Sequence, residues 1–159
     1  MSRGLGDVYK RQPNTADNNY LGFRFVIYFF IPFLLLMTWR SVIHLFYTEY
    51  GLHNIANIKV IEGSPDPMPI IYTFFSLWGL IQLLFCFFSW VILFKYRSLL
   101  PLMIMFFLIE WSFRVLNSFN SPLNLAEYKI GTTPGVELAP FVTVFLLILF
   151  ITSLLKRKS

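Results

Sequence analysis

Charged residues and cysteine are both scarce in this chain. Only 13% of its 159 residues are charged, whereas 57% are hydrophobic. Soluble domains carry about 25% charged residues, so this composition excludes an ordinary soluble domain. The single cysteine, Cys86, cannot form a disulfide, a CxxC redox motif or a cysteine-based metal site within one chain. We expect it to be a small buried packing residue.

Histidine is equally sparse and does not indicate a metal centre. His44 and His53 are nine residues apart, and neither a cysteine nor a cluster of carboxylates lies near them in the sequence. No metal site is therefore predicted. No residues suggest a cofactor by themselves. The chain also has no basic stripe typical of nucleic-acid binding, so no nucleic-acid partner is expected.

The first twelve residues have an unusual origin. The run Asp7-Val8-Tyr9-Lys10-Arg11-Gln12 reads as the in-frame translation of a transposon-based sequencing adaptor, GAT GTG TAT AAG AGA CAG. We therefore interpret residues 1–12 as an adaptor artefact, an interpretation that leaves the position of the native start codon open; the alternative is a genuine polar tail. Removing its three basic residues and one acidic residue lowers the formal charge from +5 to +3.

A short polar tail, residues 13–20, precedes one membrane domain, residues 21–159. Within that domain, four apolar runs are long enough to span a bilayer, which takes about 20 residues. Backbone groups in hydrocarbon must be satisfied internally, so these runs must be helices. The sequence predicts an all-α membrane protein, a four-transmembrane-helix bundle with spans at about 21–46, 70–94, 99–119 and 137–155.

The basic residues predict the orientation of the four spans. Arg24, the turn 95–98 and the C-terminal run 156–158 all fall on one side of a four-span topology. The opposite side carries an excess of acidic residues: Glu49, Glu62, Asp66 and Glu127, against Lys59 and Lys129. Because basic residues concentrate in cytoplasmic loops, both termini are predicted to be cytoplasmic.

The third span carries an acidic and a basic residue in its middle. Ionisable groups at this depth cost about 2.5–3.5 kcal/mol each on insertion scales, so their presence needs a reason. Glu110 and Arg114 are four residues apart and share one helix face, on which they can pair. Glu110 lies about 16 Å from the start of the span, near mid-membrane. Asn117 continues the same face outward.

The neighbouring spans offer partners for this pair. Gln82 in the second span is also near mid-depth, where its amide can bond a carboxylate on another helix, with Gly79 allowing close approach there. Arg40 and His44 lie near the outer end of the first span. Together with Glu110, Arg114 and Asn117, these residues predict an outward-facing polar pocket.

Each of these residues also has a structural interpretation. Glu110–Arg114 is equally consistent with an ion pair that only fixes helix packing, with Gln82 as interhelical glue. Arg40 is consistent with snorkelling to the outer head groups. The tryptophans at 78, 90 and 111 are expected to be packing or interfacial residues.

Several segments together resemble a known group of proteins: 77–83 (LWGLIQL), 95–101 (KYRSLLP), Glu110-x-x-x-Arg114, Pro134-Gly135 and Pro140. They resemble small bacterial four-span membrane proteins, similar in length and layout to the DoxX-like family, from residue 21 to the C-terminus. The resemblance implies a multi-pass protein of the bacterial cytoplasmic (inner) membrane. It also implies a membrane subunit linked to quinone or thiol redox chemistry, with quinone as the possible cofactor.

Three functional hypotheses follow. The first is a non-catalytic membrane protein that binds a lipid or small amphiphile, or acts as a homo-oligomer or a subunit of a membrane complex. The second is a redox subunit or enzyme in which Glu110 carries a proton and Arg114 clamps an anion or carbonyl. The third is an oligomeric small-solute transporter, which is ranked lowest because the inverted repeats and broken helices usual for transporters are missing.

Overall fold

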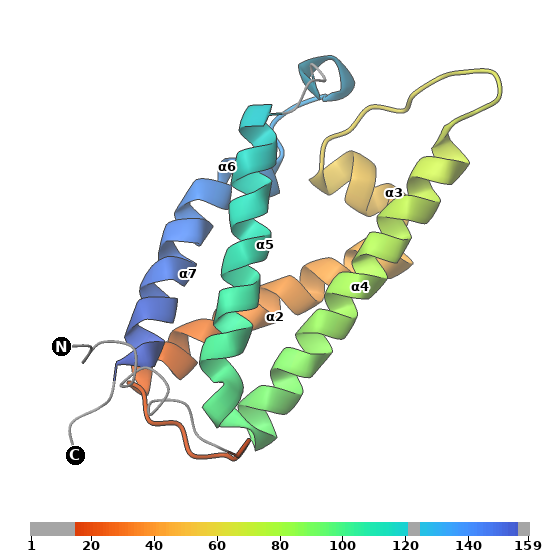
Figure 1. The fold of residues 1–159 in the computed structure, drawn as a ribbon. Coiled ribbons are helices and arrows are strands. Elements are labelled where there is room, and N and C mark those ends of the chain that lie inside the picture. The colour runs from red at the N-terminus through yellow and green to blue at the C-terminus, as the bar shows by residue number, and fades with distance from the viewer. Residues whose placement is uncertain (1–14, 121–124, 156–159) are drawn as a thin grey trace.

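Four long helices dominate the computed structural model, which describes residues 15–120 and 125–155 (Figure 1). They are α2 (Phe25–Phe46), α4 (Met68–Lys95), α5 (Leu100–Asn120) and α7 (Ala139–Leu154). Short helices join them: α3 (Thr48–Tyr50), η1 (Gly51–Ile55), η2 (Arg97–Leu99), η3 (Leu125–Tyr128) and α6 (Pro134–Glu137). No strand occurs in the described ranges, which confirms the all-helical prediction.

Three of these helices, α2, α4 and α5, are long and apolar enough to cross a membrane. Helix α7 is apolar but has only 16 residues. Each long helix falls close to a predicted span, the largest difference being that α2 begins at Phe25 instead of residue 21. The chain before it packs against the end of α7: a Cβ on Gly22 would lie 2.7 Å from the Ser153 carbonyl oxygen. The predicted adaptor, residues 1–12, lies outside the described residues.

Helix α2 packs along α4, and α5 packs along α7. The buried residues of α4 include the small residues Gly79, Cys86 and Ser89, and small residues let helix backbones approach closely. Gly79 is the closest point, because a Cβ there would lie 2.7 Å from the Leu45 backbone nitrogen. The sequence predicted that Gly79 lets α4 approach the helix that carries Glu110, and this prediction is wrong. Gly79 faces α2, whereas α4 contacts α5 through longer side chains such as Gln82.

Aromatic rings fill the space between the two helix pairs. The Phe107 ring of α5 lies 5.8 Å from Phe30, 5.1 Å from Phe33 and 4.5 Å from Phe85, measured between centroids. Cys86 is fully buried in the same core, as predicted. The pairs are thus joined by bulky rings, which hold them further apart than the helices within a pair.

Hydrogen bonds tie the helix pairs together at both ends. At the end where α4 turns into α5, the Ser98 backbone nitrogen and Oγ donate to the Asp17 carbonyl oxygen at 3.1 and 2.9 Å. The predicted polar tail therefore packs, in its described part, on that turn. At the other end, Ile58 bridges to Lys129, and the Lys59 backbone nitrogen donates to the Tyr128 carbonyl oxygen at 2.8 Å.

Candidate functional site

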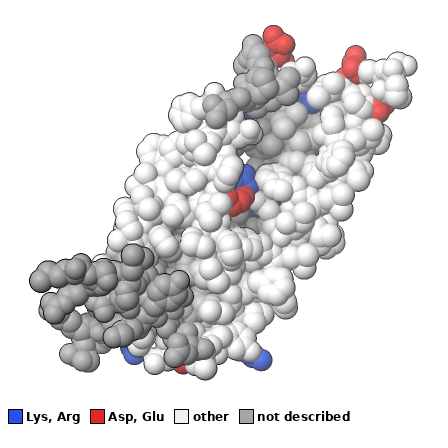
Figure 2. Space-filling model, in the orientation of Figure 1, with Lys and Arg blue, Asp and Glu red and all other residues white. Residues whose placement is uncertain are grey.

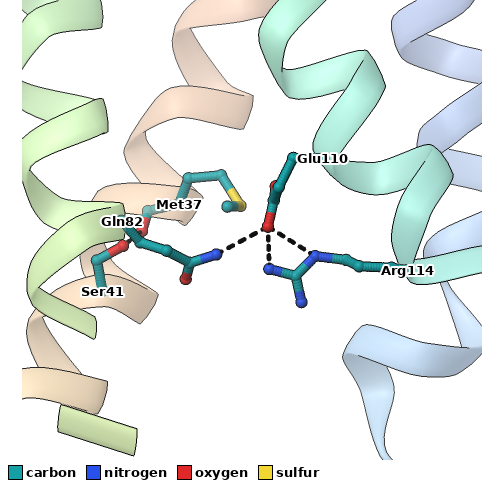
Figure 3. A network of polar contacts seen from close by, with 5 residues as sticks. All are labelled: Met37, Ser41, Gln82, Glu110 and Arg114. Atoms are coloured by element: carbon teal, nitrogen blue, oxygen red, sulfur yellow. Dashed lines mark hydrogen bonds and ion pairs between the residues drawn. The ribbon is translucent and has the colours of Figure 1, made fainter. Parts of the chain in front are cut away.

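Glu110 and Arg114 form an ion pair on α5, and Gln82 of α4 joins it (Figure 3). Arg114 donates to Glu110 Oε1 through Nε at 2.8 Å and also through Nη2. Gln82 Nε2 donates to the same oxygen at 2.9 Å. The structure thus contains both the i,i+4 pair and the interhelical hydrogen bond that the sequence predicted. One carboxylate oxygen takes all three bonds.

Two other oxygens of this cluster are buried without a partner. Glu110 Oε2 and Gln82 Oε1 have no hydrogen-bond partner among the described residues. The amide orientation follows from the chemistry, since only the amide nitrogen can donate to a carboxylate, which leaves its oxygen as a free acceptor. A buried acceptor without a donor costs about 1–3 kcal/mol. Both oxygens are therefore free acceptors, and each belongs to a side chain that lines a cavity.

These polar groups are at the edge of a cavity of about 400 Å³ between α4 and α5, with α2 behind it. Figure 2 shows acidic and basic side chains meeting in a hollow near the middle of this face. Apart from Glu110 and Gln82, the lining is apolar or aromatic. The lining residues are Met37, Trp78, Ile81, Gln82, Phe85, Phe106, Phe107, Ile109 and Glu110.

Trp78 connects the cavity to the two arginines. The Cζ atoms of Arg40 and Arg114 both lie 5.0 Å from the centroid of the Trp78 ring, a cation–π distance. Arg114 also lies 5.1 Å from the Trp111 ring. The sequence interpretation of Trp78 as a packing or interfacial residue missed this role. A signal was present, because Trp78 precedes Gln82 by four residues and so shares its helix face.

His44 and Arg40 belong to the same cluster but do not line the cavity. The buried His44 ring packs on Phe75 and Trp78, at centroid distances of 4.5 and 5.0 Å. His44 Nδ1 and Arg40 Nη1 are buried without a partner among the described residues. Among the described residues, Arg40 makes no ion pair. The cluster therefore contains two guanidinium groups, those of Arg40 and Arg114, and one carboxylate, that of Glu110.

Asn117 is the predicted pocket residue that the structure places apart from the others. It is exposed and is not one of the cavity-lining residues. Helices α4 and α5 meet at their connecting turn and diverge toward the opposite end, so the polar face of α5 loses its neighbour beyond Arg114 (Figure 1). The cavity is also mostly apolar, whereas the sequence predicted a polar one.

His53 has a structural role at the loop end of the bundle. Its Nδ1 lies 2.7 Å from the Ile58 carbonyl oxygen and its Nε2 lies 2.7 Å from the Tyr72 hydroxyl. Both ring nitrogens are therefore occupied. No group of three or more potential metal ligands occurs within the described ranges.

Comparisons with known proteins add no further constraint. The chain matches no protein-family model, no curated protein and no solved structure. The DoxX-like resemblance therefore stays a prediction, and the site is interpreted from its own geometry.

Proposed function

We propose that this is a four-span protein of the bacterial inner membrane that binds a lipid or other small amphiphile between α4 and α5. One observation carries the proposal: the cavity of about 400 Å³ is lined mainly by apolar side chains together with Glu110 and Gln82, each of which has an unpartnered oxygen. Ligand sites are typically 300–1,000 Å³, mainly apolar, with a few placed polar groups. An amphiphile matches this arrangement, with its chain along the rings and its head at the oxygens.

The rim of the cavity supports access from hydrocarbon. Ile81, Phe106 and Ile109 line it and are 66%, 44% and 45% exposed. Apolar side chains exposed at this depth are solvated by lipid in a membrane, so an amphiphile can reach the polar groups sideways between α4 and α5. Such a path does not require the ends of the bundle to open.

Helix α7 is the proposed fourth span. Its 16 residues extend about 24 Å, which is shorter than a hydrocarbon core of about 30 Å. Bilayers thin locally around short spans, and α6 precedes α7 with a single residue between them. Figure 2 shows mainly acidic side chains at the end that carries the long loops and mainly basic side chains at the opposite end. This distribution supports cytoplasmic termini.

A purely structural ion pair is the competing explanation. It accounts for the three hydrogen bonds to Glu110 Oε1. It leaves unused the other carboxylate oxygen, the amide oxygen of Gln82 and the apolar cavity beside them. Amphiphile binding gives all three a role and is therefore the better-supported function.

The test blocks the cavity without touching the polar cluster. Protein is purified in mild detergent, and the amphiphiles that remain bound are identified and quantified by mass spectrometry. Ile109→Trp places an indole at the rim and should reduce retention several-fold. The matched control is Phe113→Trp, also on α5, because Phe113 is 66% exposed and outside the cavity. Equal retention by wild type and both variants would contradict the proposal, as would wild-type protein that is always empty.

A further inference from the structure

We infer that the head group bound in this cavity is a neutral hydroxyl group, which donates its one hydrogen bond to Glu110 Oε2 or to Gln82 Oε1. The inference rests on the proposed function and specifies its ligand: an uncharged amphiphile that carries a hydroxyl, as opposed to an ester, an ether or an ionic lipid. Three features of the site lead to it: the kind of polar atom at the cavity, the charge around that atom, and the position of the arginines.

The polar atoms that need a partner at the cavity are acceptors. Glu110 Oε2 and Gln82 Oε1 are both buried and unpartnered among the described residues, and both belong to cavity-lining residues. An ether or ester head has only acceptor atoms and would leave these oxygens unsatisfied. A hydroxyl supplies one donor, and its own oxygen can in turn accept from a donor or water.

The surrounding charge disfavours a cationic head. Glu110 is already neutralised by Arg114, with two hydrogen bonds to one oxygen. Arg40 adds a second guanidinium, as close to the Trp78 ring as Arg114 is, at 5.0 Å. An ammonium head would therefore enter a cluster with net positive charge, where repulsion is strengthened by the low dielectric of the membrane.

The position of the arginines disfavours an anionic head in this cavity. Neither Arg40 nor Arg114 lines it, whereas the Trp78 indole on which both guanidinium groups pack does. A phosphate or carboxylate head would meet the carboxylate of Glu110 and the amide oxygen of Gln82 first. Both present lone pairs, so the contact would be repulsive. A neutral donor is the remaining class.

Brominated amphiphiles test the inference directly, because bromine quenches tryptophan fluorescence at short range and Trp78 lines the cavity. Wild-type protein in lipid nanodiscs is titrated with 5-bromoundecan-1-ol and with its methyl ether, at concentrations expressed per mole of lipid. The bromine is near the head group because Trp78 packs on the Arg114 guanidinium that binds Glu110. The Trp78→Phe variant measures the quenching of the other tryptophans, which is subtracted from that of the wild type. The saturable, Trp78-dependent quenching should require at least about 5-fold less alcohol than ether, because the ether leaves buried acceptors unpaired.

The two charged analogues are 5-bromoundecyl sulfate and (5-bromoundecyl)trimethylammonium, which keep their charge at all working pH values. Both should bind more weakly than the alcohol. Equal binding of alcohol and ether would overturn the hydroxyl inference and leave amphiphile binding intact. Tighter binding of the sulfate would overturn it in favour of an anionic head. If none of the four probes gives saturable quenching, the proposed function fails as well.

Two variants localise the effect. Glu110→Gln exchanges an acceptor for an amide that can turn a donor toward the ligand, so the preference for alcohol over ether should shrink to about 2-fold or less. Gln82→Met removes the other acceptor at similar volume and should also reduce the preference. Ser76→Ala is the control, because this serine donates to the Thr73 carbonyl oxygen on the exposed side of α4. An unchanged preference in both site variants would overturn the inference. If neither variant elutes as a folded species, the four-probe series on wild type still decides.

Discussion

Replacing Gly79 with alanine tests the contact that holds α2 against α4. A Cβ at this position would lie 2.7 Å from the Leu45 nitrogen and 2.8 Å from both the carbonyl carbon and the Cβ of His44. Two of these three atoms belong to the α2 backbone, which cannot rotate aside as a flexible side chain can. The helices must therefore separate, and overpacking of this kind costs about 1–3 kcal/mol.

Helix propensity acts in the opposite direction, because alanine is favoured over glycine by about 1 kcal/mol in a helix interior. The net expectation for Gly79→Ala is a loss of up to about 2 kcal/mol in the free energy of unfolding. Gly135→Ala is the matched control, since nothing lies within 4 Å of a Cβ added there. It should cost nothing.

The assay is unfolding by sodium dodecyl sulfate in mixed micelles, followed by circular dichroism, with the midpoint compared among wild type and both variants. A Gly79→Ala midpoint at or above that of wild type would refute the close-contact argument. An equal loss in Gly135→Ala would show that glycine itself, and not its neighbour, is responsible. Because Gly79 follows Trp78 directly, we also expect Gly79→Ala to weaken amphiphile retention.

Further predictions concern positions outside the cavity. Burial raises the pKa of the Tyr20 phenol in the folded protein. Its contribution to the free energy of unfolding should be complete below pH about 10 and fall above it, because the Tyr20 phenol of the unfolded chain ionises first. Tyr20→Phe should reduce this alkaline fall in the unfolding midpoint. Asn57 has φ 56°, and its amide nitrogen donates to the Thr132 carbonyl oxygen. Asn57→Leu should therefore lower the free energy of unfolding in the detergent assay by about 2–3 kcal/mol. The control Asn54→Leu, at an exposed position, should change it little, and equal losses in the two variants would contradict the prediction. Ser98→Ala removes the side-chain bond to Asp17 and should cost about 0.5–1.5 kcal/mol; an unchanged midpoint would refute that role.

Local regularities explain what could be predicted from the sequence. Long apolar runs located the helices, because hydrocarbon forces each run to satisfy its own backbone. The spacing of Glu110 and Arg114 placed both on one face, and rise per residue placed Gln82 at a matching depth. Each of these inferences needs only the geometry of one helix or the depth of a residue in the membrane. The hydrogen bonds that join Glu110 to Arg114 and to Gln82 agree with both inferences.

Relations between helices were much harder to predict. Helix α4 is apolar on nearly every side, so its sequence shows no face preference that assigns Gly79 to α2 instead of α5. The divergence of α4 and α5 away from their connecting turn is a relation between two helices, and Asn117 is exposed on α5 (Figure 1). The role of Trp78 depends on two arginines from two other helices converging on one indole. None of these arrangements has a local sequence pattern.

The division into two helix pairs has a consequence for the order in which the chain assembles. Helices α2 and α4 are complete once synthesis has passed Lys95, and they contact each other closely without any later residue. Helices α5 and α7 form the second close pair from the remainder of the chain. The cavity exists only after the second pair docks on the first through the phenylalanine rings. The proposed amphiphile site would therefore form only with this docking, and a substitution that prevents docking should leave a helical protein that retains no amphiphile.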